Sequence, residues 1–329
     1  MVTLSDKKGK KMSEKVSKNA VRKAGEILKK NIHSKSDLDL LSTYRTNHIE
    51  IMKTLVKTIS KKLPKPILIA RRLKRLNSII KKLQRFEKMD LDRMQDIGGV
   101  RAIFKDNDEV YKFANNLNKI YKDKRTALKI VKENDYIKTP KDDGYSSYHI
   151  VFKYEGKIEN LKGYHIELQL RDTISHAWAT AVEVLALISN TNLKVGKGDE
   201  NYKRFFYLAS KLLRGDILVK DEMIKINNEC KIIELLRGLS VASDNINKRE
   251  KTKDFYIITI DYNAKVVKIL GFKKDELNTA KNLYQAIETN EQTDSVLISI
   301  SDIKNLKKAY PNYFLDARFF INKILNELK

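Results

Sequence analysis

The segment HIELQLR, residues 165–171, alternates apolar and polar side chains as a β-strand with one buried face does. Its polar side carries an acid, an amide and a base in succession, residue types that can bind ions and move protons. A strand face exposed to water would suit the same alternation, so the pattern alone leaves both interpretations open. The apolar side consists of Ile166, Leu168 and Leu170, and the polar side of His165, Glu167, Gln169 and Arg171.

A second group of polar residues lies in MQDIGGVRAIF, residues 94–104, where Asp96 stands just before a predicted strand and Arg101 lies inside it. An acid at a strand edge can hold a metal ion, and the adjacent Gly98 and Gly99 let a backbone approach a phosphate closely. A turn that begins at an Asp and leads into a strand is also common. The motif therefore needs support from elsewhere in the chain.

The segment DGYSSYHIVF, residues 143–152, also alternates, and it places Tyr145 and His149 on one face. A half-exposed tyrosine beside Gly144 can stack on a nucleobase, and an aromatic residue at a hairpin edge is the alternative. Ser147 shares the face of Tyr145, and Tyr148, Ile150 and Phe152 form the other face.

Several common sites are excluded by their missing motifs. The sequence contains no GxxxxGK[ST], no GxGxxG, no HExxH and no His-Asp dipeptide, which argues against a P-loop nucleotidase, a dinucleotide dehydrogenase, a zincin and an HD-type phosphohydrolase. The single cysteine, Cys230, excludes an intramolecular disulfide and a cysteine-rich zinc site.

Taken in order, four motifs resemble those of the RelA/SpoT synthetase domain, whose members move pyrophosphate from ATP to a nucleotide 3′-hydroxyl. The resemblance extends from about Arg72 to Trp178, and the agreement of four short motifs in order makes chance unlikely. The motifs are RRLKRLNSIIKK (71–82), QDIGGVRAI (95–103), TPKDDGYSSYH (139–149) and HIELQLRDTISHAWA (165–179).

The resemblance implies a site for ATP and metal. Asp96 and Glu167 match the two acids that hold Mg²⁺ on the ATP phosphates in this family. Arg72 would stack on the adenine ring, and Lys74, Lys82 and Arg101 would contact the ATP phosphates. Metal and cations would neutralise charge on the phosphates while the acceptor hydroxyl is held in line.

The resemblance also implies an acceptor site. Glu167 would take the proton of the 3′-hydroxyl, and Tyr145 would stack on the acceptor base. His149 and Lys141 would lie near the acceptor's phosphates. Glu183 would read the acceptor base, although its offset from the Trp-Ala segment departs from the usual pattern. Gln169 and Arg171 would orient these groups.

The elements that must position these residues can be placed coarsely. Pro64 and Pro66 interrupt the chain between two helical regions, and the polar segment NINKREKTK, residues 245–253, reads as a linker. We expect helices within 13–31, over 36–62 with Ser36 as N-cap, over 67–86 and 110–121, and from 176 to about 243; strands at 100–104, 128–132, 147–154 and 164–171, the last two as an antiparallel hairpin; and finally a hairpin over 255–270, a helix over 275–289 and a strand at 295–301.

We therefore predict an α/β protein of the α+β type, with a nucleotidyltransferase-like mixed sheet flanked by helices and a small C-terminal α/β domain. The expected divisions are a basic helical region at 1–62, the synthetase domain at 63–190, a helical segment at 191–244 and the C-terminal domain at 245–329. With no HD hydrolase domain before the synthetase and no long regulatory region after it, a small stand-alone synthetase is expected.

The charge of the chain is large and uneven. The formal net charge is +24, but residues 251–329 hold 13 Lys plus Arg against 10 Asp plus Glu, which leaves +21 on residues 1–250. Residues 53–88 hold 13 basic residues and one acid, Glu87, as expected for an anionic partner, although a lysine-rich proteome is an alternative source of scattered lysines. No apolar run approaches a membrane span, and we expect a soluble, cytoplasmic protein; homo-oligomer formation stays open.

Three functions fit these observations. The first is synthesis of (p)ppGpp from ATP and GDP or GTP with Mg²⁺. The second is pyrophosphorylation of the 3′ end of tRNA, as toxic small synthetases of the family perform, which the basic first 250 residues would suit. The third is a non-catalytic RNA-binding protein on a synthetase scaffold. Retention of the expected metal ligands and nucleotide contacts disfavours the third.

One C-terminal motif stands apart. Tyr310–Tyr313 in AYPNYF resembles the Tyr-x-x-Tyr of antitoxin-like domains that block the ATP site in fused synthetases, and a Pro-Asn turn over two packed tyrosines is the alternative. The balanced charge of the C-terminal region predicts that it restrains activity, so truncation near Lys251 is expected to raise turnover.

Overall fold

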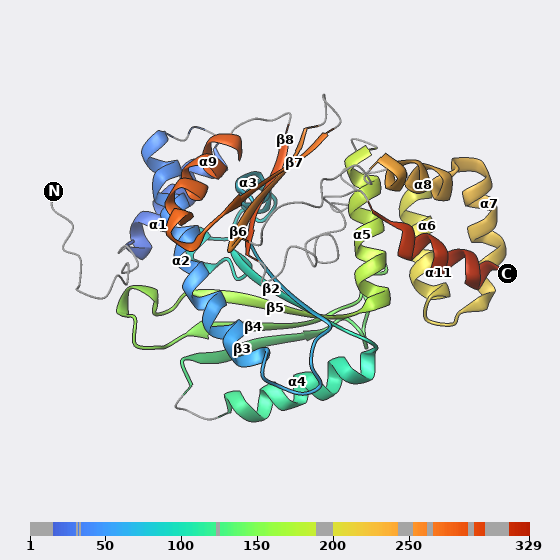
Figure 1. Ribbon diagram of the computed structural model, residues 1–329, viewed down its shortest axis with the longest axis horizontal. Helices are drawn as coiled ribbons and strands as arrows, with labels where there is room; N and C mark the ends of the chain where they lie inside the picture. Colours follow the sequence, from blue (N-terminus) through green and yellow to red (C-terminus); the bar gives the residue numbers. More distant parts are fainter. Residues whose placement is uncertain are drawn as a thin grey trace.

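The computed structural model describes residues 16–30, 32, 34–122, 126–188, 200–242, 253–261, 266–288, 293–299 and 316–329. They form one eight-stranded sheet with helices packed on it and a second group of helices beside it (Figure 1). The strands are β1 (Leu68–Leu73), β2 (Gly98–Phe104), β3 (Leu128–Asp135), β4 (Tyr148–Tyr154), β5 (His165–Asp172), β6 (Phe255–Asp261), β7 (Val266–Phe272) and β8 (Thr293–Ser299). The helices used below are α1 (Lys18–Lys29), α2 (Lys35–Ile59), α3 (Leu76–Arg85), α4 (Asn107–Tyr121), α5 (Thr173–Ile188), α6 (Glu200–Leu212), α7 (Lys220–Cys230), α8 (Ile232–Ala242), α9 (Leu277–Glu288) and α11 (Arg318–Leu328).

The sheet is mixed, as predicted. Its order is β3-β4-β5-β2-β1-β8-β6-β7, in which β2 and β5 run parallel and every other neighbouring pair runs antiparallel. The predicted hairpin of β4 and β5 is confirmed, and so is the C-terminal hairpin of β6 and β7. A parallel pair needs a long crossover, and here β3 and β4 with their connections provide it.

In the part of the sheet formed by β1, β2 and β5, one face is covered by helices and the other carries the polar side chains of the site. On the covered face, a Cβ at Gly98 would come within 2.9 Å of the His48 Cβ of α2, and the rings of Phe104 and Phe113 of α4 lie 4.8 Å apart. Ile166, Leu168 and Leu170 of β5 are fully buried on this face. The predicted alternation of HIELQLR is thus confirmed, and its polar side faces away from α2 and α4.

The predicted helix over 67–86 is wrong in its first half, where the chain forms strand β1 before helix α3. Leu73 keeps the apolar spacing of the helix, but it pairs with Gly98 in the sheet, and the strand lies between β2 and β8. Backbone pairing with two neighbours that are distant in sequence outweighs the local helical period. A smaller correction concerns α2, whose N-cap is Ser34, in a capping box with Asp37, and not Ser36.

The C-terminal quarter contributes to both parts of the molecule. Its strand β8 pairs with β1, so β6, β7 and β8 extend the same sheet that carries β2 and β5. Its last helix, α11, packs with α5, α6 and α8, where Phe206 and Phe320 lie 5.7 Å apart. The predicted domain boundaries stay a prediction, but the strands after 245 share a sheet with the preceding region. Tyr310–Tyr313 lies outside the described residues.

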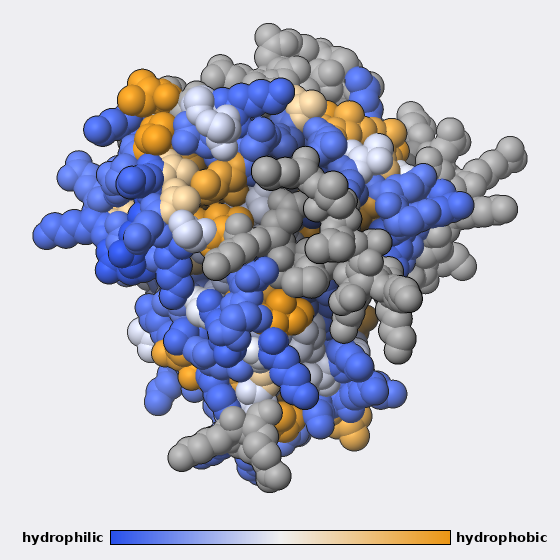
Figure 2. Space-filling model, turned by 90° about the vertical axis from the view of Figure 1, so that its left-hand side faces the viewer, coloured by the Kyte–Doolittle hydropathy of each residue, from blue (hydrophilic) through white to orange (hydrophobic). Residues whose placement is uncertain are grey.

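The surface seen from the side of α1 and α9 is mainly hydrophilic, with scattered apolar side chains (Figure 2). This agrees with the 33% of charged residues in the sequence. Within the described ranges, no helix is long and apolar enough to cross a membrane.

Candidate active site

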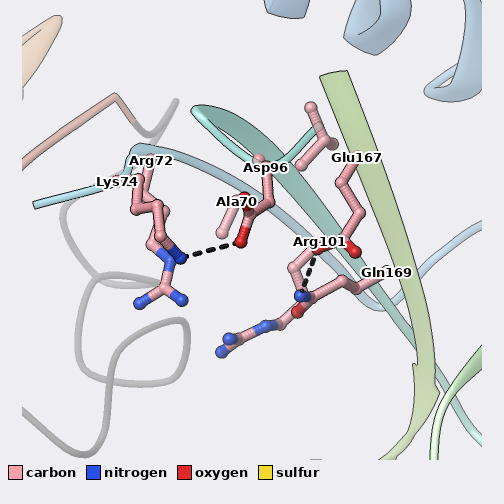
Figure 3. Close-up of a pocket in the computed structure, with 9 residues that line it drawn as sticks. Ala70, Arg72, Lys74, Asp96, Arg101, Glu167 and Gln169 are labelled. Carbon is pink, nitrogen blue, oxygen red and sulfur yellow. Dashed lines mark hydrogen bonds and ion pairs between the residues drawn. The ribbon is translucent and has the colours of Figure 1, made fainter. Parts of the chain in front are cut away.

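A pocket opens on the polar face of β1, β2 and β5 (Figure 3). Side chains from β1 and the turn after it reach the pocket from one side, and those of β5 reach it from the other. The lining residues are Ala70, Arg72, Lys74, Asp96, Gly99, Val100, Arg101, Glu167 and Gln169. Six of these were singled out for chemistry from the sequence, so motifs distant in the chain converge at one place.

Strand register explains this convergence. Arg72 of β1 lies opposite Gly99 of β2, and Gly99 lies opposite Glu167 of β5. A Cβ at Gly99 would meet only the backbone oxygen of Arg72, at 3.8 Å, so it would project into open space. The missing side chain therefore leaves a hollow between a guanidinium and a carboxylate, which lets a ligand approach the backbone.

The acid at the start of β2 is held by two lysines. Lys74 Nζ donates to Asp96 Oδ2 at 2.7 Å, and Lys82 Nζ of α3 donates to Asp96 Oδ1 at 2.8 Å. Burial would raise the pKa of Asp96, but the two ammonium groups lower it to about 2. Burial lowers the pKa of Lys74, and the charges of Lys82 and Arg72 add to this against the opposing effect of Asp96. Two cations on one acid leave the site with excess positive charge.

Arg101 adds to this excess. Its side chain is half-buried, and burial together with nearby Arg171 and Arg72 lowers its pKa to about 9, against the opposing effect of Glu183. Among the described residues, Nε of Arg101 and Nε of Arg171 are buried without a hydrogen-bond partner. A half-buried guanidinium with an unused donor is a binding group for an anion such as phosphate.

On the other side of the pocket, Glu167 begins a chain of hydrogen bonds. Its Oε1 lies 2.9 Å from His149 Nδ1, and His149 Nε2 lies 2.8 Å from the Tyr145 hydroxyl. Arg171 donates to the same hydroxyl at 2.7 Å, and Gln169 donates to Glu167 Oε2 at 2.8 Å. The polar face of HIELQLR is therefore an ordered network, which settles its interpretation against a plain solvated strand face.

Three groups in this chain, Glu167, His149 and Tyr145, have shifted pKa values. Burial would raise the pKa of Tyr145, but Arg171 and His149 lower it to about 7. Burial would lower the pKa of His149, yet Tyr145 and Glu167 raise it. Burial would raise the pKa of Glu167, and the hydrogen bond from His149 lowers it. The network thus favours an ionised Glu167 beside a protonated His149.

The aromatic surroundings of Tyr145 include Tyr136, which the sequence did not single out. Tyr136 packs against Tyr145 with ring centroids 6.2 Å apart and against His149 at 5.2 Å. The Lys141 ammonium lies over both tyrosine rings, 4.6 Å from Tyr136 and 5.0 Å from Tyr145. An aromatic residue just before a basic, glycine-containing loop was the signal that could have found it.

The loop of Tyr145 rests on helix α6. Gly144 has φ of +89°, in the left-handed region that suits glycine, and a Cβ there would lie 2.6 Å from Ser210 Oγ of α6. Ser210 in turn accepts from Arg214 at 2.7 Å. This close approach fixes the turn that leads into Tyr145.

The donor set suits a hard cation held partly by substrate. Asp96 and Glu167 are close enough for the charge of Asp96 to raise the pKa of Glu167. Among the described residues, no group of three acidic, histidine or cysteine side chains converges as a complete metal cage. Mg²⁺ is commonly bound by one or two carboxylates together with substrate phosphates, so the residues present fit this ion.

The structure does not bring all predicted site residues to the pocket. Lys82 reaches it through Asp96, whereas Tyr145, His149 and Arg171 lie behind Glu167 and Gln169. Lys141 and Glu183 are not among the lining residues: Lys141 lies over the Tyr145 ring, and the charge of Glu183 raises the pKa of Arg101.

Part of the chain is similar to a known protein family. Residues 71–185 match the family described as "Region found in RelA / SpoT proteins". The chain is 35% identical over 115 residues to GTP pyrophosphokinase YwaC of Bacillus subtilis (strain 168), which covers 33% of this chain and 52% of that protein. It is 31% identical over 115 residues to GTP pyrophosphokinase YjbM of the same organism, covering 33% and 51%. The chain thus spans about half the length of the curated relatives it matches.

Solved structures give partial similarity. Small alarmone synthetase 1 from Bacillus subtilis, bound to its product pppGpp, is 25% identical, with 56% of this chain and 94% of that chain covered and a TM-score of 0.43. Small alarmone synthetase 2 from the same organism is 24% identical, with 57% and 96% covered and a TM-score of 0.44.

Proposed function

With residues 71–185 as a RelA/SpoT region, we propose that the chain transfers the β,γ-pyrophosphate of ATP to the 3′-hydroxyl of GDP or GTP and so makes (p)ppGpp. The relatives YwaC and YjbM carry the name GTP pyrophosphokinase, and this supports the proposal. The observation that carries it is the pair of carboxylates, Asp96 and Glu167, beside the Gly99 hollow and a surplus of cations.

The ATP side of the pocket is assigned to phosphate binding. Arg72 would stack on adenine, and the ammonium groups of Lys74 and Lys82 would exchange the Asp96 carboxylate for phosphate oxygens. Arg101 would offer its unused donors to the same phosphates. Asp96 and Glu167 would then hold Mg²⁺, which supplies positive charge against the triphosphate.

The chemical step is a displacement at the β-phosphorus. The acceptor 3′-oxygen forms a new bond to the β-phosphorus. The bond between the β-phosphorus and the oxygen that bridges it to the α-phosphate breaks, and AMP leaves with that oxygen. Glu167 takes the proton of the 3′-hydroxyl, and His149 holds the carboxylate in place through its Nδ1 contact. Gln169 fixes the second oxygen of Glu167, and Arg171 orients Tyr145.

The acceptor would enter from the side of Tyr145. The ring of Tyr145 is assigned to stacking on the acceptor base, with Lys141 and His149 near the acceptor's phosphates. Glu183 is assigned to the acceptor base itself. A guanine nucleotide needs one stacking ring and a few cations, and this group supplies them.

The test is transfer of label from γ-labelled ATP with Mg²⁺ to GDP, GTP or deacylated tRNA, each in a separate reaction. Label in GDP or GTP is expected. Label in tRNA alone, with a rate that falls steeply as salt rises, would replace the nucleotide acceptor by tRNA, because RNA binding releases counterions along its backbone.

Transfer to the tRNA 3′ end is a second candidate because of one observation, the charge of +21 on residues 1–250. The ATP site accounts for several of these cations, which weakens the argument. A non-catalytic RNA-binding role has less support, because a site without catalysis has no need of the ordered chain from Glu167 to Tyr145.

A further inference from the structure

A buried polar cluster joins the C-terminal region to the ATP side of the pocket. Glu288, the last residue of α9, forms an ion pair with Arg45 of α2, with Arg45 Nη1 2.7 Å from Glu288 Oε2 and Nη2 3.1 Å from Oε1. Tyr284 donates to Glu288 Oε1 at 2.6 Å and accepts from Arg45 Nη2 at 2.9 Å. Arg45 is 4% exposed and Glu288 8%, so these charges are shielded from water.

The same carboxylate also reaches helix α3. The backbone N–H of Leu76, the first residue of α3, donates to Glu288 Oε1 at 2.7 Å. The first amides of a helix have no partner within the helix, and a side chain at the N-cap normally satisfies one of them. Here the N-cap residue Arg75 makes no such bond. A negative charge at this end also favours the helix dipole.

Helix α3 carries Lys82, one of the two lysines that bind Asp96. Lys74 precedes its first residue by two positions, and Lys82 lies within it. Both ammonium groups bind Asp96, so the place where α3 begins sets the distance between the two lysines and the metal-binding acid.

We propose that Glu288 is a positioning residue for the ATP site, which fixes the start of α3 from the C-terminal region and so places Lys74 and Lys82. The inference rests on the proposed ATP site. Glu288 lies far in sequence from every motif of residues 71–185. Among the described residues its hydrogen-bond partners are Arg45, Leu76 and Tyr284, none of which lines the pocket.

Two double variants separate the cap from the ion pair. Arg45→Met with Glu288→Gln removes both charges but keeps an acceptor oxygen for the Leu76 N–H. Arg45→Met with Glu288→Met removes both charges and the acceptor. Since each pair leaves no buried charge without a partner, both proteins are expected to fold. Gln285→Ala is the matched control, because Gln285 joins the same two helices through Asp39 at the surface without reaching α3.

The measurements are thermal melting, calorimetric binding of an α,β-methylene ATP analogue with Mg²⁺, and KM for ATP and for the acceptor. The variant with Arg45→Met and Glu288→Met is expected to bind the analogue about fivefold more weakly than the variant with Arg45→Met and Glu288→Gln. This difference corresponds to the loss of a helix cap. KM for ATP should rise while KM for the acceptor stays unchanged. Equal binding by the two folded variants overturns the inference and leaves the proposed function standing.

Two further outcomes are decisive. Absence of analogue binding by the wild-type protein overturns the proposed function and this inference together. If the protein with Arg45→Met and Glu288→Met does not melt cooperatively, Arg45→Met with Glu288→Leu replaces it, since Leu also offers no acceptor, and hydrogen exchange of the first amides of α3 is expected to be faster than in Arg45→Met with Glu288→Gln. Equal exchange in those two proteins also overturns the inference.

Discussion

The two sides of the pocket are held together differently. On the ATP side, the long side chains of Lys74 and Lys82 bind Asp96, and among the described residues no other hydrogen bond holds their ammonium groups. On the acceptor side, Glu167 is linked to His149 and Tyr145, short or aromatic groups with few rotatable bonds. The first arrangement can exchange partners when an anion arrives, whereas the second is already in order.

The difference shows how one sheet can serve two substrates. Ion pairs of flexible lysines cost little to rearrange, since phosphate oxygens replace the carboxylate they leave. A network of aromatic and imidazole groups loses its geometry when any member moves. We therefore expect substitutions on the acceptor side to reduce the rate of transfer, and those on the ATP side to reduce affinity for ATP and metal.

The largest effect is expected at Glu167, which belongs to both sides. Glu167→Gln should lower transfer by about 10³-fold, because it removes the proposed metal ligand and proton acceptor while the side-chain volume stays the same. Transfer rate and thermal melting should be measured together. A folded Glu167→Gln enzyme with near wild-type activity would remove Glu167 from the chemistry.

Asp96→Asn should have the next largest effect, a loss of about 10²-fold in kcat/KM for ATP. The amide binds Mg²⁺ weakly and attracts Lys74 and Lys82 less. Titration of activity with Mg²⁺ is the measurement, and a curve shifted to higher metal concentration is expected. If the Mg²⁺ requirement is unchanged, Asp96 is not a metal ligand.

Tyr145→Phe tests the acceptor side by removing one hydroxyl. The ring remains for stacking, but the contacts to His149 and Arg171 are lost. We expect kcat to fall about tenfold with analogue affinity unchanged, about the effect of losing one hydrogen bond to a charged group. Tyr145→Leu is the companion variant and should in addition raise KM for the acceptor. Weaker ATP binding by Tyr145→Phe would contradict the division into two sides.

The two adjacent glycines provide a matched pair on the ATP side. Gly99→Ala fills the hollow between Arg72 and Glu167, so it should weaken analogue binding several-fold, about 1 kcal/mol, with the fold intact. Gly98→Ala brings a Cβ to 2.9 Å from His48, so it should lower the free energy of unfolding by about 1–3 kcal/mol. Calorimetry and urea unfolding separate the outcomes. A reversal of the two effects would invalidate the assignment of faces.

The last prediction concerns the pH dependence of stability. The folded pKa of Asp96 is about 2, below its ordinary value, so its ion pairs stabilise the protein above about pH 4 and lose this contribution as pH falls through 2. In metal-free buffer, wild type should exceed Asp96→Asn by about 2 kcal/mol in unfolding free energy at pH 5, and the difference should shrink toward pH 3. A constant difference would mean that the lysines do not hold the carboxylate.

Restraint by the C-terminal region stays a prediction, and truncation near Lys251 is a poor test of it. The cut would also remove β8, which pairs with β1 beside Arg72, and Glu288, which binds the first amide of α3. A loss of activity after truncation would therefore report on these contacts.

The sequence by itself determined the strands other than β1 and the identity of the chemical groups. The alternation in HIELQLR was enough to assign its buried and polar faces, and the paired glycines marked the place where a ligand approaches backbone. These features are local, because period-two alternation and glycine conformation depend on neighbouring residues. The motif order then gave the site residues as a family resemblance.

Only the tertiary structure decided which groups meet. The pairing of Glu167 with His149, the grip of two lysines on Asp96 and the contact of Glu288 with Leu76 join residues distant in the chain. The same is true of β1, whose helical spacing was overruled by strands on both sides. Such contacts leave no periodic pattern in the local sequence, because they form when the register of the sheet brings separate segments side by side. That register is set by the packing of the whole sheet.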